Sequence, residues 1–327
     1  MKKFFRVAGI VVGIIVVLII GFLIYFNASF PKAEKVKDIK VEVTPARVTR
    51  GEYLANHVAG CMDCHSGHDW TMYSGPLIPG SLGKGGEKYD QKSGGVPGVI
   101  YAKNITPAGI GDWSDGELIR AITTGVAKDG TALFPLMPYT NFNRLSKEDL
   151  YSIVAYIRSL KPIENNVPDR HLDFPMNLIV KTIPLKSYNP APQPDTSNII
   201  LYGKYLTTIA SCADCHTQMV KGEPVKGMEF AGGMEFGMQS GIVRSANITP
   251  DNETGIGKWT KEQFINFFKA FDTDSTKNIH VKPHEFNTMM PVTFYAGMTT
   301  TDLGAIYTYL RTIKPVHNKV VKLTPVD

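Results

Sequence analysis

Cys61-Met62-Asp63-Cys64-His65 and Cys212-Ala213-Asp214-Cys215-His216 decide the fold of this 327-residue chain, and together they use all four of its cysteines. Each motif has the C-x-x-C-H spacing, in which two thiols form thioethers to one porphyrin and the next histidine ligates its iron. The pattern therefore predicts two covalently attached haems c. The expected attachment residues are Cys61, Cys64, Cys212 and Cys215, and the expected axial histidines are His65 and His216.

Two other uses of a C-x-x-C pair account less well for these motifs. A zinc site would need the two halves to cooperate across about 150 residues, and it would leave both histidines unexplained. A thioredoxin-like redox pair needs one motif only and no histidine after it. Haem attachment explains every cysteine and both histidines.

The segment from Val7 to Phe26 contains twenty residues without a charge. At about 1.5 Å of rise per residue, a helix of this length spans about 30 Å, the thickness of a bilayer's hydrocarbon core. A cleaved signal peptide is the alternative, but its apolar region is usually about 7–15 residues long. We therefore predict a retained single-pass anchor over residues 1–26, followed by a polar stalk over residues 27–50.

The net charge of +5 is concentrated around this anchor. Residues 1–50 hold nine Lys/Arg and three Asp/Glu, so the rest of the chain is close to neutral, which argues against nucleic-acid binding. Lysines flank both ends of the anchor, so charge alone does not set its orientation. Haem attachment implies the exported side. We expect a cytoplasmic N-terminus and haem domains on the periplasmic face of the inner membrane.

The chain also repeats itself with a period near 150 residues, which predicts two copies of one domain. We expect a first repeat over residues 51–162 and a second over residues 200–318, joined by a proline-rich surface linker (163–199) and followed by a tail (319–327). The matching blocks keep their order: Gly51-Glu52-Tyr53-Leu54 and Gly203-Lys204-Tyr205-Leu206, Asn104-Ile105-Thr106-Pro107 and Asn247-Ile248-Thr249-Pro250, Gly109-Ile110-Gly111-Asp112-Trp113 and Gly255-Ile256-Gly257-Lys258-Trp259, and Tyr156–Pro162 and Tyr309–Pro315.

Each repeat is predicted to be mainly helical. A short helix leads into the haem motif from Gly51 or Gly203, and a second helix follows the tryptophan, where Ser114-x-x-Glu117 and Thr260-x-x-Gln263 have the form of capping boxes. A last helix follows Ser146, with apolar residues recurring on one face, and a proline ends it.

The sixth ligand of each iron is predicted to be a methionine that precedes a proline. Met137-Pro138 and Met290-Pro291 lie 153 residues apart, in register with the last helices. A proline biases the residue before it towards an extended conformation, which suits a loop that presents a sulfur. Met72 is too close in sequence to His65 to reach the far face of the porphyrin readily, and Met289 is the adjacent competitor of Met290.

Other residues near the motifs have less specific interpretations. A distal histidine is the alternative to methionine, with His284 as the best candidate, while His57, His68 and His280 are expected at the surface or near propionates. Trp113 and Trp259 are expected to line the haem edges or to pack in the core. Asp272-x-Asp274-x-Thr276 begins like a calcium loop but lacks the glycine and glutamate of an EF-hand.

With these blocks, the chain resembles the membrane-anchored multihaem c-type cytochromes, among them the cytochrome subunits of membrane-bound alcohol and gluconate dehydrogenases. The resemblance covers nearly the whole chain. It implies a mainly α fold with two tandem class I-like cytochrome c domains after an N-terminal transmembrane helix. It also implies haem ligation at His65 and Met137 and at His216 and Met290. Those subunits hold three haem domains, whereas this chain has two motifs.

These inferences predict an electron-transfer protein, or a non-catalytic cytochrome subunit of an oxidoreductase complex, because His/Met ligation leaves no open iron site. The expected donor is a membrane dehydrogenase or a quinol-oxidising complex, and the expected acceptor is a downstream cytochrome or oxidase. A dihaem peroxidase is one alternative and requires unlike haem sites. A haem-based sensor without electron flow is another. No Rossmann or P-loop fingerprint is present.

Overall fold

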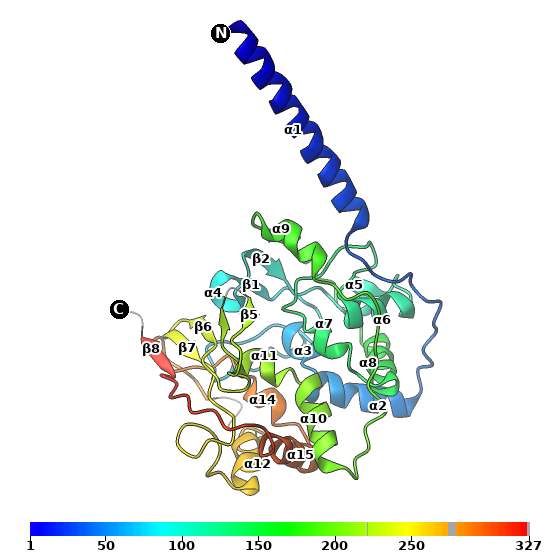
Figure 1. The fold of residues 1–327 in the computed structure, drawn as a ribbon. Coiled ribbons are helices and arrows are strands. Elements are labelled where there is room, and N and C mark those ends of the chain that lie inside the picture. Colours follow the sequence, from blue (N-terminus) through cyan, green and yellow to red (C-terminus); the bar gives the residue numbers. More distant parts are fainter. Residues whose placement is uncertain (221, 274–278, 326–327) are drawn as a thin grey trace.

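The computed structural model describes residues 1–220, 222–273 and 279–325. One long helix, α1 (Lys2–Ser29), stands away from a body that holds the rest of the described chain (Figure 1). α1 buries none of its residues, and in the described part of the chain it is the one helix long and apolar enough to cross a membrane. Residues 274 and 276 of the calcium-like loop, and 326–327 of the tail, lie outside the described residues.

The body is mainly helical, as predicted. The helices of its first half are α2 (Pro45–Tyr53), the π-helix η1 (Leu54–Val58), α3 (Cys61–Cys64), α4 (Gln91–Gly94), α5 (Pro107–Ile110), α6 (Asp115–Thr124), α7 (Tyr139–Phe142) and α8 (Lys147–Ser159). Those of its second half are α10 (Ile199–Ile209), α11 (Cys212–His216), α12 (Lys261–Lys269), α14 (Val292–Tyr295) and α15 (Thr300–Leu310).

The helix that leads into each haem motif begins earlier than predicted. α2 starts at Pro45, inside the segment predicted to be a stalk, and α10 starts at Ile199 rather than at Gly203. Thr44 caps α2 by accepting a hydrogen bond from the backbone N of Arg47 at 3.3 Å, and proline suits the first helical position. The folded body therefore begins before residue 51.

The first and last helices of each repeat cross at a glycine. α2 packs on α8 and α10 packs on α15, and these are the most extensive helix contacts in the described chain. A Cβ added to Gly51 would lie 1.8 Å from the carbonyl oxygen of Ser152, and one added to Gly203 would lie 2.0 Å from that of Ala305. The glycines at the head of each Gly-x-Tyr-Leu block thus let two helix backbones touch.

Three small antiparallel sheets, which the sequence analysis did not predict, accompany the helices. Most strands of these sheets come from the glycine-rich segments that lie between each haem motif and the later helices of the same repeat. The sheets are β1 (Lys88–Asp90), β2 (Gly98–Tyr101) and β3 (His171–Leu172); β4 (Met219–Val220) and β5 (Glu223–Pro224); and β6 (Glu235–Met238), β7 (Gly241–Arg244) and β8 (Leu323–Pro325).

One hydrophobic cluster runs through both halves of the body and includes Leu54, Ile153, Leu206 and Leu303. The segment predicted to be a surface linker takes part in a second, smaller cluster. It contains β3, α9 (Met176–Ile179) and the 3-10 helix η2 (Val180–Thr182). Leu172 and Val180 are buried there against Val96, so this segment lies on the body and is partly packed into it.

Candidate haem sites

The two C-x-x-C-H motifs adopt the same local structure. Each forms a single helical turn, α3 or α11, directly after a residue with positive φ: Gly60 at 68° and Ser211 at 55°. None of the four cysteines forms a disulfide. One turn of helix brings the two sulfurs of a motif to the same side of the chain, as attachment to one porphyrin requires.

Burial raises the pKa of every one of these thiols. The pKa of Cys61, Cys212 and Cys215 rises to about 12, and that of Cys64 rises as well. A zinc site or a reactive redox pair requires thiolates, which this setting disfavours. Within the described ranges, no three His, Cys, Asp or Glu side chains gather as they would around a metal ion.

His65 and His216 are each held by a backbone carbonyl group. Nδ1 of His65 lies 2.6 Å from the carbonyl oxygen of Lys103, and Nδ1 of His216 lies 2.7 Å from that of Ala246. An Nδ1–H that donates to a carbonyl leaves Nε2 with a free lone pair. Burial lowers the pKa of both imidazoles, so they are kept neutral. This donor set fits a haem c at each motif.

The Asn-Ile-Thr-Pro blocks hold these two carbonyl groups in place. Each block begins directly after the carbonyl that the histidine contacts. Nδ2 of Asn104 donates to the carbonyl oxygen of Ile163 at 2.8 Å, while its Oδ1 accepts from the backbone N of Thr106 at 2.9 Å. Asn247 makes the same bonds to Val316 and Thr249, at 2.8 and 2.9 Å. The block therefore ties the histidine's partner to the segment after the last helix.

A glycine completes each histidine site, and the sequence analysis missed it. The backbone N of Gly85 donates to the carbonyl oxygen of His65 at 2.8 Å, and Gly232 does the same for His216 at 2.7 Å. A Cβ on either glycine would lie 2.5 Å from the carbonyl carbon of Lys103 or Ala246. Their only signal in the sequence is a Gly-Gly pair at 85–86 and 232–233.

The two Met-Pro steps also share one geometry. Pro138 has φ −79° and ψ 53°, and Pro291 has φ −79° and ψ 66°. The backbone N two residues after each methionine donates to its carbonyl oxygen, at 2.7 Å for Met137 and 2.8 Å for Met290. These are inverse γ-turns. Both methionines are half-buried against the main hydrophobic cluster.

The competing ligands have other surroundings. His284 is exposed, and with Met289 it lines a groove that also contains Trp70 and Asn287. His280 is exposed as well, whereas Nδ1 of His57 lies 3.1 Å from the carbonyl oxygen of Phe294.

The two tryptophans differ in their surroundings. Trp113 is half-buried against the main cluster, whereas Trp259 is 37% exposed and packs edge-on against Phe267. The arginine near the end of each last helix donates to backbone carbonyls of the adjacent Gly-Ile-Gly-x-Trp block: Arg158 to Ile110 and Trp113, and Arg311 to Ile256 and Gly257. In both repeats, therefore, the Gly-Ile-Gly-x-Trp block supplies the carbonyl groups that bind this arginine.

The two motifs lie close enough to affect one another electrostatically. Burial is the main cause of the raised pKa of Cys64, and the charge on Cys215 adds to it. Tyr295, whose hydroxyl donates to the carbonyl oxygen of Ala210 at 2.9 Å, feels both motifs: after burial, Cys212, Cys215, Asp63 and Cys64 raise its pKa.

Each methionine loop is held partly by the opposite repeat. The hydroxyl of Ser74 donates to the carbonyl oxygen of Met290 at 2.7 Å. In the other direction, Asn141, which follows the Met137-Pro138 step, donates to Ser211 at 3.1 Å and to Asp214 at 2.9 Å, beside the second motif. The two candidate sites are therefore coupled structurally.

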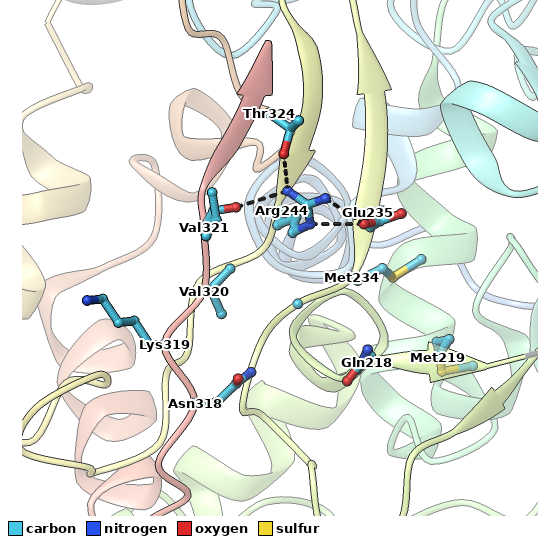
Figure 2. Close-up of a pocket in the computed structure, with 11 residues that line it drawn as sticks. Gln218, Met219, Met234, Glu235, Arg244, Asn318, Lys319, Val320, Val321 and Thr324 are labelled. Carbon is cyan, nitrogen blue, oxygen red and sulfur yellow. Dashed lines mark hydrogen bonds and ion pairs between the residues drawn. The ribbon is translucent and has the colours of Figure 1, made fainter. Parts of the chain in front are cut away.

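A surface pocket of the second half lies apart from these sites. It is lined by residues of β6, β7 and β8, and Figure 2 shows Arg244 at its wall between Glu235 and the C-terminal strand. Nε of Arg244 donates to Glu235 at 2.9 Å, and Nη1 donates to Thr324 at 2.8 Å. None of the cysteines, axial histidines or Met-Pro methionines lines this pocket, so it is not a candidate haem site.

Comparison with known proteins places the chain beside c-type cytochromes. It is 30% identical over 293 residues to the cytochrome c subunit of the quinone alcohol dehydrogenase of Gluconacetobacter polyoxogenes, covering 83% of this chain and 57% of the relative. It is 28% identical over 296 residues to the gluconate 2-dehydrogenase cytochrome c subunit of Pantoea cypripedii, covering 83% and 60%. A dihaem c-type cytochrome of Cereibacter sphaeroides is 25% identical over 177 residues, covering 52% and 56%.

No family model matches the chain. Among c-type cytochromes, the chain is similar to the cytochrome c subunits of alcohol and gluconate dehydrogenases. The resemblance predicted from its motifs is therefore confirmed. The chain spans somewhat more than half the length of these relatives.

Proposed function

We propose that the chain is a membrane-anchored electron carrier with two tandem class I-like cytochrome c domains, each holding one covalently attached haem c. The observation that carries this proposal is the pair of histidines, His65 and His216, each fixed through Nδ1 to a backbone carbonyl at 2.6 and 2.7 Å. Relatives that are cytochrome c subunits support electron transfer through haem c and a non-catalytic role for the chain.

A bound haem c would supply one-electron chemistry through its iron. Cys61 and Cys64 would attach the first haem and Cys212 and Cys215 the second, while His65 and His216 would bind the irons. Met137 and Met290 would complete the ligation, which would raise the reduction potential and close the iron to exogenous ligands. The matched turns around the two methionines favour like sites over the unlike sites of a dihaem peroxidase.

α1 anchors the protein in the inner membrane as a single span, with the N-terminus in the cytoplasm and the body in the periplasm. Its length and its apolar surface, of which no residue is buried, support this placement. A membrane dehydrogenase or quinol-oxidising complex donates electrons, and a downstream cytochrome or oxidase accepts them. The names of the relatives, which are subunits of dehydrogenases, favour the first kind of donor.

A redox titration followed by optical and EPR spectroscopy tests the ligation. Met137→Ala and Met290→Ala should each lower the potential of one haem and remove its sulfur-to-iron charge-transfer band. Met72→Ala and Met289→Ala are the matched controls and should leave both haems unchanged. If neither Met-Pro variant alters a haem, the sulfur ligation is wrong. Rapid peroxide turnover, or a high-spin haem in the reduced wild type, would favour the peroxidase instead.

A further inference from the structure

The segment between the two repeats carries an unusually exposed aromatic side chain. Phe174 is 80% exposed. Among the described residues that follow α1 in the chain, no other large apolar residue is as exposed. Ile179, at the end of α9, is 44% exposed. Exposed apolar side chains of this size that lie close together mark a surface that contacts another molecule or a membrane.

This segment is fixed to the body rather than free. Val180, next to Ile179, is completely buried, and Leu172, two residues before Phe174, is buried in the same small cluster. The backbone N of Asp173 also donates to the carbonyl oxygen of Pro97 at 3.0 Å. The two apolar side chains are therefore held outward by a folded support.

The same segment is joined to the end of α1. Nζ of Lys181 lies 2.5 Å from Oδ1 of Asn27, the residue directly after the apolar span that ends at Phe26. The backbone N of Glu34 donates to the carbonyl oxygen of Lys186 at 2.8 Å. Figure 1 shows α9 on the side of the body from which α1 leaves. Phe174 and Ile179 are thus carried at the level where α1 would emerge from a bilayer.

The charges around this level suit phospholipid headgroups. Residues 30–40 contain four lysines against Glu34 and Asp38, and the segment from 170 to 186 adds Arg170, Lys181 and Lys186 against Asp173. Basic side chains beside a membrane helix attract anionic lipids. Elements that lie in the interface of a membrane usually combine exposed apolar side chains, here Phe174 and Ile179, with neighbouring basic side chains.

We propose that Phe174 and Ile179 form a second membrane contact, inserted at the boundary between headgroups and acyl chains of the bilayer that α1 crosses. This inference rests on the proposed membrane anchorage. A single helix anchor leaves the tilt of the body relative to the membrane plane to the few bonds at the end of α1. A second contact fixes which face of the body looks at the membrane, and therefore how the haem sites stand relative to membrane partners.

Photo-cross-linking of the full-length, haem-loaded chain in vesicles of phosphatidylethanolamine and phosphatidylglycerol tests the proposal. The photoreactive residue p-benzoylphenylalanine replaces Phe174, Ile15 in the middle of α1, or Leu201. Leu201 is the matched control because it is 61% exposed at the start of α10, an element on the far side of the body from α1 (Figure 1). After irradiation, mass spectrometry counts the lipid adducts.

We expect position 174 to give at least about tenfold more lipid adduct than position 201, because an interfacial side chain reaches acyl C–H bonds and an exposed periplasmic one does not. Lipid adducts at Ile15 with none at Phe174 would overturn the second contact and leave the anchor intact. Absence of adducts at Ile15 would overturn the anchor itself. Cross-links from position 174 to a second copy of the chain would assign the apolar side chains to a protein interface and also overturn the proposal.

Discussion

The hydroxyl of Tyr53 lies 2.5 Å from Oδ2 of Asp302, in the last helix of the opposite repeat. The reciprocal bond, from Tyr205 to Oδ2 of Asp149, measures 2.6 Å. Each hydroxyl also accepts a bond from the backbone N of the capping residue of that helix, at 3.1 Å from both Thr299 and Ser146. The third residue of each Gly-x-Tyr-Leu block thus joins the two repeats in a pseudo-twofold arrangement.

Removing one of these hydroxyls should weaken the interface between the repeats. We expect Tyr53→Phe and Tyr205→Phe each to lower the free energy of unfolding by about 1–3 kcal/mol, because each leaves a buried carboxylate short of a partner, and Tyr205→Phe also leaves the buried backbone N–H of Ser146 short of one. At the carboxylate, Asp149 still pairs with Arg50 at 2.9 Å, whereas among the described residues Asp302 keeps a neutral tyrosine, Tyr202, as its side-chain partner.

Chemical denaturation in detergent, followed by haem absorbance, measures this loss. Tyr101→Phe is the control, since the Tyr101 hydroxyl makes no hydrogen bond to the residues that the structure describes. A destabilisation of Tyr53→Phe no greater than that of Tyr101→Phe would show that these bonds contribute nothing net.

Alanine at the glycine crossings should disturb folding more strongly. Gly51→Ala and Gly203→Ala would each place a methyl group 1.8 or 2.0 Å from a backbone oxygen, and a backbone cannot swing away as a side chain can. We expect a loss of about 3 kcal/mol or more, the upper range for an overpacked core, with lower yield of haem-loaded protein. Gly67→Ala serves as the control, because its nearest neighbour is 3.5 Å away. Equal thermal stability of all three variants would contradict the close crossing.

Features encoded by neighbouring residues could be predicted from the sequence. Both capping boxes are confirmed: Ser114 with Glu117, and Thr260 with Gln263. The last helix of the first repeat begins after Ser146, as predicted, and its counterpart begins after Thr299. These elements depend on hydrogen bonds and side-chain spacing within about one turn of helix, so a short window of sequence contains the necessary information.

Features that depend on distant partners could not be predicted. The repeat identified Tyr53 as part of a recurring block, but its partner, Asp302, is 249 residues away. The strand β7 pairs with β6 and with β8, which lies near the C-terminus. Neither a pattern of apolar residues nor local propensity specifies that pairing. The methionine ligands remain predictions, because only the turns that present them are described.

Breaking the support of an axial histidine should alter its haem without removing a ligand. In Asn247→Ala, the carbonyl of Ala246 loses the anchor that holds it against His216. We expect a higher haem potential, because the bond from Nδ1–H to the carbonyl makes the imidazole a stronger donor to ferric iron, and a hold on the iron weakened roughly 10–100-fold, as for the loss of other groups that orient a metal-bound histidine. Spectroelectrochemistry and carbon monoxide binding measure these effects on the one haem. Asn247→Asp keeps the acceptor for Thr249 and should retain part of the wild-type behaviour, whereas loss of structure alone would affect both variants alike.

His68 should make the stability of the first repeat depend on pH. Its side chain is 5% exposed, stacks on Trp70, and lies 3.4 Å from Asp63 and 3.6 Å from Glu87. Burial opposes its charge, but the two carboxylates outweigh burial and raise the pKa to about 9, while His68 and Trp70 lower the pKa of Glu87 against its own burial. The second repeat has Met219 at the equivalent position, so the effect belongs to the first repeat alone.

The direction of this dependence follows from the two shifts. A raised histidine pKa adds stability that is complete below the ordinary value of 6.5 and disappears as the pH rises through about 9. The lowered pKa of Glu87 adds stability that is present above 4.5 and is lost as the pH falls further. Denaturation of the wild type should therefore show a contribution on the order of 2–3 kcal/mol between pH 4.5 and 6.5 that declines towards pH 9. His68→Gln should remove this slope, while His171→Gln, at an exposed histidine, should preserve it. An unchanged slope in His68→Gln would show that the imidazole is neutral in the folded protein.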